Sequence, residues 1–396
     1  MKHSKTMKLH RYFKMIAILL IATNLPFLAH AAGEAGNTLA SGVIDDQQYN
    51  RAIHIMAMLL IGFGFLMVFV RKYGRSALTA TFLLVSTSLP LYMLINRVGL
   101  GDSESEIRRL ILAEFGAASL LIAAGAVLGR LKMQQYVLLG LLFVPFYVLN
   151  EWIVLNGGLG LIKAGSVVDT GGSIVIHAFG AIFGLGVALT MTTKQEFEKT
   201  IETDSTSDRY SMLGSMMLWI FWPSFCAALV PPDLMPHTVV NVILALCGST
   251  LTTYLVSVSI RKKISIADIA NAALAGGVAI GSTCAHASHT MAVIIGIMAG
   301  GLSTFGFAVI QSKQQKLMKI IDTCGVTNLH GLPGLMGGLV ALPVIKGLHM
   351  ESQLMGILIT ILVAFLTGMI TGKVLPLLGR KLEAYDDADE FIDTEE

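Results

Sequence analysis

A short pattern occurs twice in the sequence: Asp-Thr-x-Gly, followed by a histidine eight residues after the aspartate. The two copies are DTGGSIVIH, from Asp169 to His177, and DTCGVTNLH, from Asp322 to His330. Each histidine lies in an apolar segment, where ionisable side chains are costly and commonly mark a substrate or proton path. An imidazole can also donate and accept hydrogen bonds at the same time.

Two imidazoles that face each other away from water cannot both carry charge cheaply. We therefore expect His177 and His330 to form a neutral pair that shares one proton through a hydrogen bond. Such a pair suits a small molecule that both donates and accepts hydrogen bonds. The alternative is two histidines that join helices and bind nothing. Asp169 and Asp322 have two compatible interpretations, as helix N-caps and as charges that act on a substrate.

The composition predicts that the elements carrying these residues lie in a lipid bilayer. The chain has 396 residues, of which 54% are hydrophobic and 14% charged, and its mean hydropathy is +0.71. Soluble domains have about 25% charged residues, so this chain has too little polar material to cover a water-facing surface. The net charge is only +2, with no basic cluster interleaved with aromatic residues, so we expect no nucleic-acid partner.

The N-terminus has the features of a secretory signal peptide over residues 1–31. A basic stretch, MKHSKTMKLHRYFK, precedes the apolar MIAILLIATNLPFLA, and Ala29-His30-Ala31 is a suitable cleavage site. The mature chain would then begin near Ala32, outside the cytoplasm. The alternative is an additional span that is not cleaved.

We predict an all-α membrane protein with eleven transmembrane helices, since a span needs about 20 apolar residues. The polar link from Thr192 to Asp208 divides residues 32–380 into halves at 52–192 and 210–345, followed by a final helix at 354–375. The acidic tail, residues 381–396, is expected to be disordered. The expected spans are 52–70, 77–95, 110–129, 133–155, 171–191, 211–230, 238–260, 264–283, 289–310, 326–345 and 354–375.

Lys and Arg concentrate in the connections on one side of these spans, which is therefore assigned to the cytoplasm. This predicts a multi-pass protein of the cell inner membrane, with its mature N-terminus outside and its C-terminus in the cytoplasm. The fifth helix then runs inward from Asp169 and the tenth runs outward from Asp322. Opposed copies of one motif indicate an inverted repeat of five helices plus five.

The inverted repeat predicts where the two histidines meet. Eight helical residues advance about 12 Å, so each histidine would lie that deep from opposite faces of a core about 30 Å thick. If the two helices are neighbours, His177 and His330 should touch at the middle of the membrane.

Other residue patterns give little sign of an enzyme, a cofactor or a metal site. The four cysteines form no CxxC motif, and the sequence contains no HExxH or GxSxG. An intramembrane hydrolase or metalloenzyme using the His and Asp residues is thus the weaker hypothesis. Glu114 and Glu151 also lie inside expected spans, where we expect each to be hydrogen-bonded between helices; the alternative is that either polarises the vestibule of a substrate path. Glycine runs at 180–184 and 296–300 predict close helix packing.

Four stretches of the sequence resemble the ammonium transporter/Rhesus glycoprotein family, and specifically its Rhesus branch. They are GGSIVIHAFGAIFGL, LWIFWPSFCAAL, NAALAGGVAIG and DTCGVTNLHGLPGLMGGLV. The resemblance covers all eleven expected spans and implies a homotrimer with one pore per subunit. The short loops and the signal peptide indicate a bacterial member.

The resemblance also assigns roles to individual residues. His177 and His330 match the twin histidines that line a narrow apolar lumen. Phe115, in LILAEFGAA, and Phe225, in FWPSF, match two stacked phenylalanines that close the outer mouth. Asp169 matches an acid near the outer vestibule, where ammonium loses its proton, and Asp322 is its counterpart toward the cytoplasm.

The function implied is an ammonium or ammonia channel. A bare cation is too costly in an apolar lumen, whereas neutral ammonia is not. The bacterial ammonium-transporter branch has a tryptophan over the outer mouth, but the matching stretch here, LNGGLGLIKAGS, has none. Low-affinity passage driven by a gradient is therefore expected. The alternative function is a pore for carbon dioxide or neutral gases in general.

Overall fold

The computed structural model describes residues 41–96 and 105–392. Within these ranges the chain is helical, and extended residues pair only at an isolated bridge between Lys72 and Asp386. The chain from Asp45 onward forms one compact unit; of the unit before it, only residues 41–44 are described. The prediction of an all-α protein is confirmed for the described residues. The expected signal peptide and its cleavage site lie outside them.

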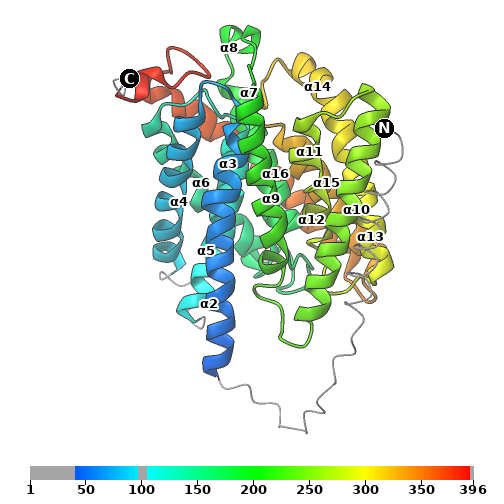
Figure 1. Cartoon of the computed structure of the whole chain (residues 1–396). Coiled ribbons are helices and arrows are strands. Elements are labelled where there is room, and N and C mark those ends of the chain that lie inside the picture. The colour runs from blue at the N-terminus through cyan, green and yellow to red at the C-terminus, as the bar shows by residue number, and fades with distance from the viewer. Residues whose placement is uncertain (1–40, 97–104, 393–396) are drawn as a thin grey trace, which may run out of the picture. The chain divides into compact units, whose positions relative to one another are not determined.

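Seven helical segments are long and apolar enough to cross a membrane, and most of them can be followed in Figure 1. Several contain short π-helical or 3₁₀ pieces, so one span can carry several labels. Their bounds are α2 (Ser41–Ala57) continued by η1 (Met58–Phe63), α3 (Gly64–Leu66) and η2 (Met67–Phe69); α4 (Gly74–Asn96); α6 (Met133–Val154); η4 (Ser173–Ala178) continued by α7 (Phe179–Met191); α10 (Met235–Arg261); α13 (His289–Phe305) continued by η5 (Gly306–Ile310) and α14 (Gln311–Met318); and α16 (Met350–Val374) continued by η7 (Leu375–Leu378).

The other four expected spans also fall on helices, but these are shorter or more polar. They are α5 (Glu106–Gly125), α9 (Ser205–Cys226), α11 (Ile266–Ala272) with α12 (Ala275–Ile280), and η6 (Thr327–Gly331) with α15 (Leu332–Val344). The first of them carries two arginines and two glutamates, and α11 with α12 covers only residues 266–280. The count of eleven spans stays a prediction. The remaining short helices are η3 (Gly158–Gly160), α8 (Lys194–Glu198) and η8 (Ala388–Glu390).

Glycines bring the helices into backbone contact, as their spacing predicts. A Cβ atom added at Gly296 of α13 would collide with the backbone of Ala245 in α10, and one added at Gly300 with that of Ser249. The run from 180 to 184 in α7 packs against α5 in the same way. Small residues at such positions allow the close approach on which helix association in lipid depends.

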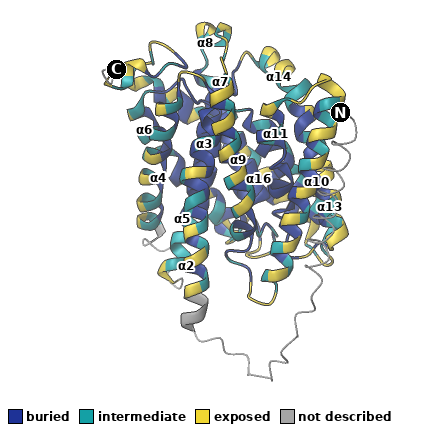
Figure 2. Ribbon diagram, viewed as in Figure 1, coloured by how far each residue is buried: buried dark blue, intermediate teal, exposed yellow. Residues whose placement is uncertain are grey.

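Large apolar side chains are exposed on the outward faces of several helices. Leu251 and Leu255 of α10 are 65% and 60% exposed, and Leu366 and Ile370 of α16 are 56% and 53% exposed. Figure 2 shows exposed residues on the outward faces of the helices and buried residues in the interior of the bundle. This pattern is the reverse of a water-facing surface and is that of a multi-pass membrane protein.

The C-terminal tail is ordered as far as residue 392, so the prediction of disorder is wrong for this part. The Asp387 carboxylate accepts hydrogen bonds from the guanidinium and the backbone N–H of Arg75, at 3.0 and 3.1 Å. The Tyr385 N–H donates to the carbonyl of Gly129 at 2.8 Å, and burial raises the pKa of the Tyr385 hydroxyl. The acidic tail docks because cationic residues meet it there.

Candidate substrate pore

The two histidines of the repeated motif are in contact. The Nδ1 atoms of His177 and His330 are 3.2 Å apart, and their ring planes lie within 14° of parallel. Both side chains are buried, with 2% of each residue exposed. The contact that the motif spacing predicts is therefore confirmed. A hydrogen bond between two Nδ1 atoms requires one ring to donate while the other accepts, so the pair shares one proton.

Both histidines lie in short π-helical segments at the start of a longer helix. His177 is in η4, which leads into α7, and His330 is in η6, which leads into α15. Single π-helical turns are rare and are often found at functional sites. Pro333 follows in the first turn of α15, where its missing N–H leaves a carbonyl of the preceding turn without its usual donor.

The aspartate of each motif holds the start of its π-helical segment. Oδ2 of Asp169 accepts hydrogen bonds from the N–H groups of Ile174 and Val175, at 2.9 and 2.8 Å. The Asp322 carboxylate accepts from the N–H groups of Val326 and Thr327, at 3.0 and 2.9 Å. The capping role is thus present at both sites, and it fixes the segment that carries each histidine.

The glycine of each motif makes a tight turn between the aspartate and the helix. Gly172 has φ of 74° and Gly325 has φ of 65°, in the left-handed region that favours glycine. Each donates its N–H to the carbonyl of the motif aspartate, at 2.9 and 3.2 Å. The assumption of eight continuous helical residues is therefore wrong, because the first residues form a turn. The motif Asp-Thr-x-Gly is the sequence of this turn.

Each turn is joined to the other half of the sequence by backbone hydrogen bonds. The N–H of Gly171 donates to the carbonyl of Gly281 at 2.8 Å, and the N–H of Thr323 donates to the carbonyl of Ala126 at 3.1 Å. The Ser282 hydroxyl also donates to Asp169 Oδ1 at 2.6 Å. Both histidine-bearing segments are therefore positioned by residues distant in sequence.

Aromatic rings extend the histidine pair in both directions. Trp222 stacks on His177, with ring centroids 5.5 Å apart and planes 23° apart, and Phe63 stacks on His330 at 6.3 Å and 27°. Neither Trp222 nor Phe63 was identified from the sequence, although Trp222 lies in the FWPSF stretch. Among the described residues, His177 Nε2 has no hydrogen-bond partner. That nitrogen is free to meet a substrate.

The two phenylalanines assigned to a gate are in contact, but they are not stacked. The ring centroids of Phe115 and Phe225 are 4.7 Å apart and the planes make an angle of 54°. Phe225 also lies 6.1 Å from the His177 ring. Phe115, Phe225 and His177 are therefore joined by ring contacts, and a tilted contact suits the positive edge and negative face of two rings.

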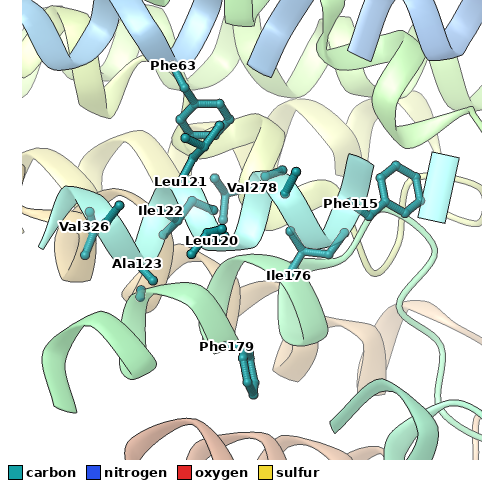
Figure 3. Packing of buried hydrophobic residues seen from close by; sticks show 14 of the residues in the cluster. Phe63, Phe115, Leu120, Leu121, Ile122, Ala123, Ile176, Phe179, Val278 and Val326 are labelled. Atoms are coloured by element: carbon teal, nitrogen blue, oxygen red, sulfur yellow. The ribbon is translucent and has the colours of Figure 1, made fainter. Parts of the chain in front are cut away.

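A narrow apolar cavity adjoins His330 on the other side of the pair. Its volume is about 20 Å³, enough for one molecule of the size of water. Leu121 and Phe63, two of its lining residues, lie close together in Figure 3. A larger cavity of about 360 Å³, lined partly by Asp208, Gln311 and Thr323, shares three lining residues with it: Phe69, Asn271 and Cys324.

The two glutamates inside expected spans differ. Oε2 of Glu151 accepts a hydrogen bond from the Tyr92 hydroxyl at 2.5 Å, which joins α6 to α4 as predicted. Glu114 is fully buried, and neither of its carboxyl oxygens has a partner among the described residues. The prediction of an interhelical hydrogen bond is wrong for Glu114. The described residues also contain no group of three or more His, Cys, Asp or Glu able to hold a metal ion.

Comparison with known proteins places this arrangement in one family. Residues 15–394 match the Ammonium Transporter Family. The ammonium transporter Rh type C of Rattus norvegicus is 35% identical over 362 residues, covering 82% of this chain and 71% of that protein. The ammonium transporter Rh type A of Bos taurus is 37% identical over 340 residues, covering 82% and 78%.

Solved structures agree with this match. Nitrosomonas europaea Rh50, described with the mechanism of conduction by the Rhesus protein family of channels, is 52% identical with a TM-score of 0.87, covering 90% of this chain and 94% of that one. Saccharomyces cerevisiae Mep2, at 16% identity and a TM-score of 0.72 over 90% and 94% of the two chains, shares the fold. The chain belongs to the Ammonium Transporter Family, and its similarity is to the Rh-type members.

Proposed function

We propose that this protein is a transmembrane channel that recruits ammonium at its outer mouth and passes ammonia through an apolar pore. One observation carries the proposal: the 3.2 Å contact between two buried imidazoles, flanked by apolar and aromatic residues. Ammonia donates and accepts hydrogen bonds, so it can exchange them with this pair. A cation that cannot release a proton meets only the cost of leaving water.

Specific roles follow for the residues around the pair. Asp169 stabilises the cation end of the path, Phe115 and Phe225 form the gate, and Asp322 positions His330 toward the cytoplasm. The proposal is supported by the capping bonds and ring contacts of these residues. Without a tryptophan in residues 155–166, we expect low affinity for ammonium.

The same proposal includes the arrangement in the membrane. Eleven spans in two inverted halves, with a signal peptide of residues 1–31, would place the mature N-terminus outside and the C-terminus in the cytoplasm of a bacterial inner membrane. The matching turns at Gly172 and Gly325 support the inverted repeat, because they lead into helices that carry equivalent histidines. A homotrimer is expected from the family resemblance.

Proteoliposomes test this function directly. An ammonium pulse should produce a faster internal pH rise in vesicles that contain the protein than in empty vesicles, and a His177→Ala, His330→Ala double variant should lose the difference. Retained flux in a folded double variant would remove the proposed role of the pair. A carbon dioxide gradient in the same vesicles tests the alternative, and equal enhancement of both gases would favour a general gas pore.

A further inference from the structure

Arg130 is a buried cation that the proposed pathway does not use. Only 1% of the residue is exposed. Its Nη1 donates to the Thr192 hydroxyl at 2.7 Å, and its Nη2 donates to the carbonyls of Ala126 and Ile321, each at 2.7 Å. Among the described residues no carboxylate lies within ion-pair distance of it. Burying a charge costs free energy, so the burial of this guanidinium has to be explained by its surroundings.

The neighbourhood of Arg130 supplies that reason. Ile321, whose carbonyl accepts from the guanidinium, directly precedes Asp322 in the sequence. The positive charge of Arg130 acts electrostatically on the Asp322 carboxylate, although the two groups make no direct hydrogen bond. Asp322 itself is occupied by backbone N–H groups. A fixed positive charge thus accompanies the fixed negative charge at this end of the pore.

Asp169, the equivalent acid of the other half, has no positively charged partner among the described residues. Asp169 is held by the hydroxyl of Ser282 and by backbone N–H groups, all of them uncharged. In the part of the chain that the structure describes, no Lys, Arg or His forms an ion pair with it. The two motifs have the same turn and the same cap, yet among the described residues only Asp322 has a buried cation near it.

We propose that Arg130 is a specificity-determining residue whose charge offsets that of Asp322, so that the pore attracts cations at the Asp169 end alone. This inference rests on the proposed function. A cation drawn to Asp169 meets, at the other end, an Asp322 whose charge is already offset, and only the neutral base continues. Placing a fixed positive charge near one end of a pore is a recognised way to exclude cations.

Replacing Arg130 tests the proposal. Wild type, Arg130→Gln and Arg130→Lys are reconstituted in parallel, and potassium current and ammonia flux are measured on the same vesicles. Arg130→Gln should raise the potassium current roughly tenfold, because a unit charge within about 10 Å of an ion changes the energy of that ion by an amount of this order at an effective dielectric constant of about 20. Arg130→Lys keeps the charge and should stay at the wild-type level. Equal currents in the two variants would overturn the proposal.

A second substitution separates charge from structure. In an Arg130→Gln, Asp322→Asn double variant both charges are gone, and the asparagine oxygen can still accept one of the two capping N–H groups, which bind different oxygens of Asp322. The potassium current should return to the wild-type level. A current as large as that of Arg130→Gln alone would mean that the leak comes from damaged packing, and it would overturn the proposal.

A further pair of variants tests the proposal if Arg130→Gln fails to fold. Thr192→Asp puts a carboxylate at the hydroxyl that Arg130 contacts and should reproduce the potassium leak, whereas Thr192→Asn, of the same size, should not. Absence of a leak in folded Thr192→Asp would overturn the proposal. Potassium current is read independently of ammonia flux. Wild-type vesicles without ammonia flux would contradict the proposed function, and the potassium currents would still decide the role of Arg130.

Discussion

Nδ1 of His177 and Nδ1 of His330 lie 3.2 Å apart, so the two rings use the same type of atom for their contact. One Nδ1 donates and the other accepts. The Nε2 atoms of both rings therefore remain for other partners: the ring that donates through Nδ1 has a bare Nε2 that can accept, and the ring that accepts through Nδ1 has an Nε2–H that can donate. The pair can serve a substrate from either direction with the same two side chains.

Replacing one imidazole should separate packing from conduction. His330→Asn can retain a hydrogen bond to His177, whereas His330→Leu leaves a buried imidazole without a partner, which costs about 1–3 kcal/mol. We expect a lower free energy of unfolding for His330→Leu than for His330→Asn. Ammonia flux should fall in both variants, because each lacks the Nε2 atom. Normal flux in His330→Asn would show that the ring is unnecessary.

The turn glycine of the second motif can be tested against another left-handed glycine. Gly325→Ala and Gly347→Ala both place a side chain at positive φ, which costs about 1–2 kcal/mol. An added Cβ at Gly347 meets nothing within 4 Å, whereas at Gly325 it would collide with Phe307. Thermal unfolding should show a larger loss for Gly325→Ala, and only that variant should lose ammonia flux. Equal effects would contradict a special role for this turn.

Asp169 is expected to act both as a cap and as a charge. Asp169→Asn keeps an oxygen that can accept the N–H groups of η4, so its thermal stability should stay close to that of the wild type. Its ammonium concentration dependence should shift to higher concentrations, since the attraction for the cation is lost. Asp169→Ala should lose stability as well as flux. If Asp169→Asn transports like the wild type, the residue is only a cap.

The docked tail offers a test that does not involve transport. Asp387→Asn weakens two hydrogen bonds with Arg75, and bonds to charged groups contribute about 1.5–3 kcal/mol. The bond between Arg380 and Lys381 should then be cleaved by trypsin roughly tenfold faster. Glu383→Gln breaks only the exposed pair with Lys199 and should change the rate little. Equal rates in both variants would mean that Asp387 does not hold the tail.

The sequence predicts those parts of the site that depend on residues close together in the chain. The repeated motif identifies His177 and His330, and the opposite directions of its two copies explain why they meet. Each capping aspartate is also separated from its partners by only a few residues, as with Asp322, Val326 and Thr327. Patterns of this kind depend on the geometry of one turn and one helix, so residue types are sufficient to reveal them.

The remainder depends on packing between distant segments. Phe63 stacks on His330, and Arg130 reaches the carbonyl of Ile321, but nothing near either residue in the sequence records these partners. Arginine side chains are also mostly exposed in proteins, so residue type alone does not predict that Arg130 is buried. The prediction of a disordered tail is wrong for a similar reason: its acidic composition is typical of a solvated segment, and its contacts with Arg75 and Gly129 come from distant parts of the sequence.

The stacking of Trp222 on His177 gives the protein an internal optical probe. An indole is sensitive to the charge of the ring against which it lies, and the other two tryptophans, at positions 152 and 219, make no ring contact with either pore histidine among the described residues. With those two replaced by phenylalanine, the emission of a single residue would report on the protonation of the imidazole beside it, in unlabelled protein and while the channel is at work.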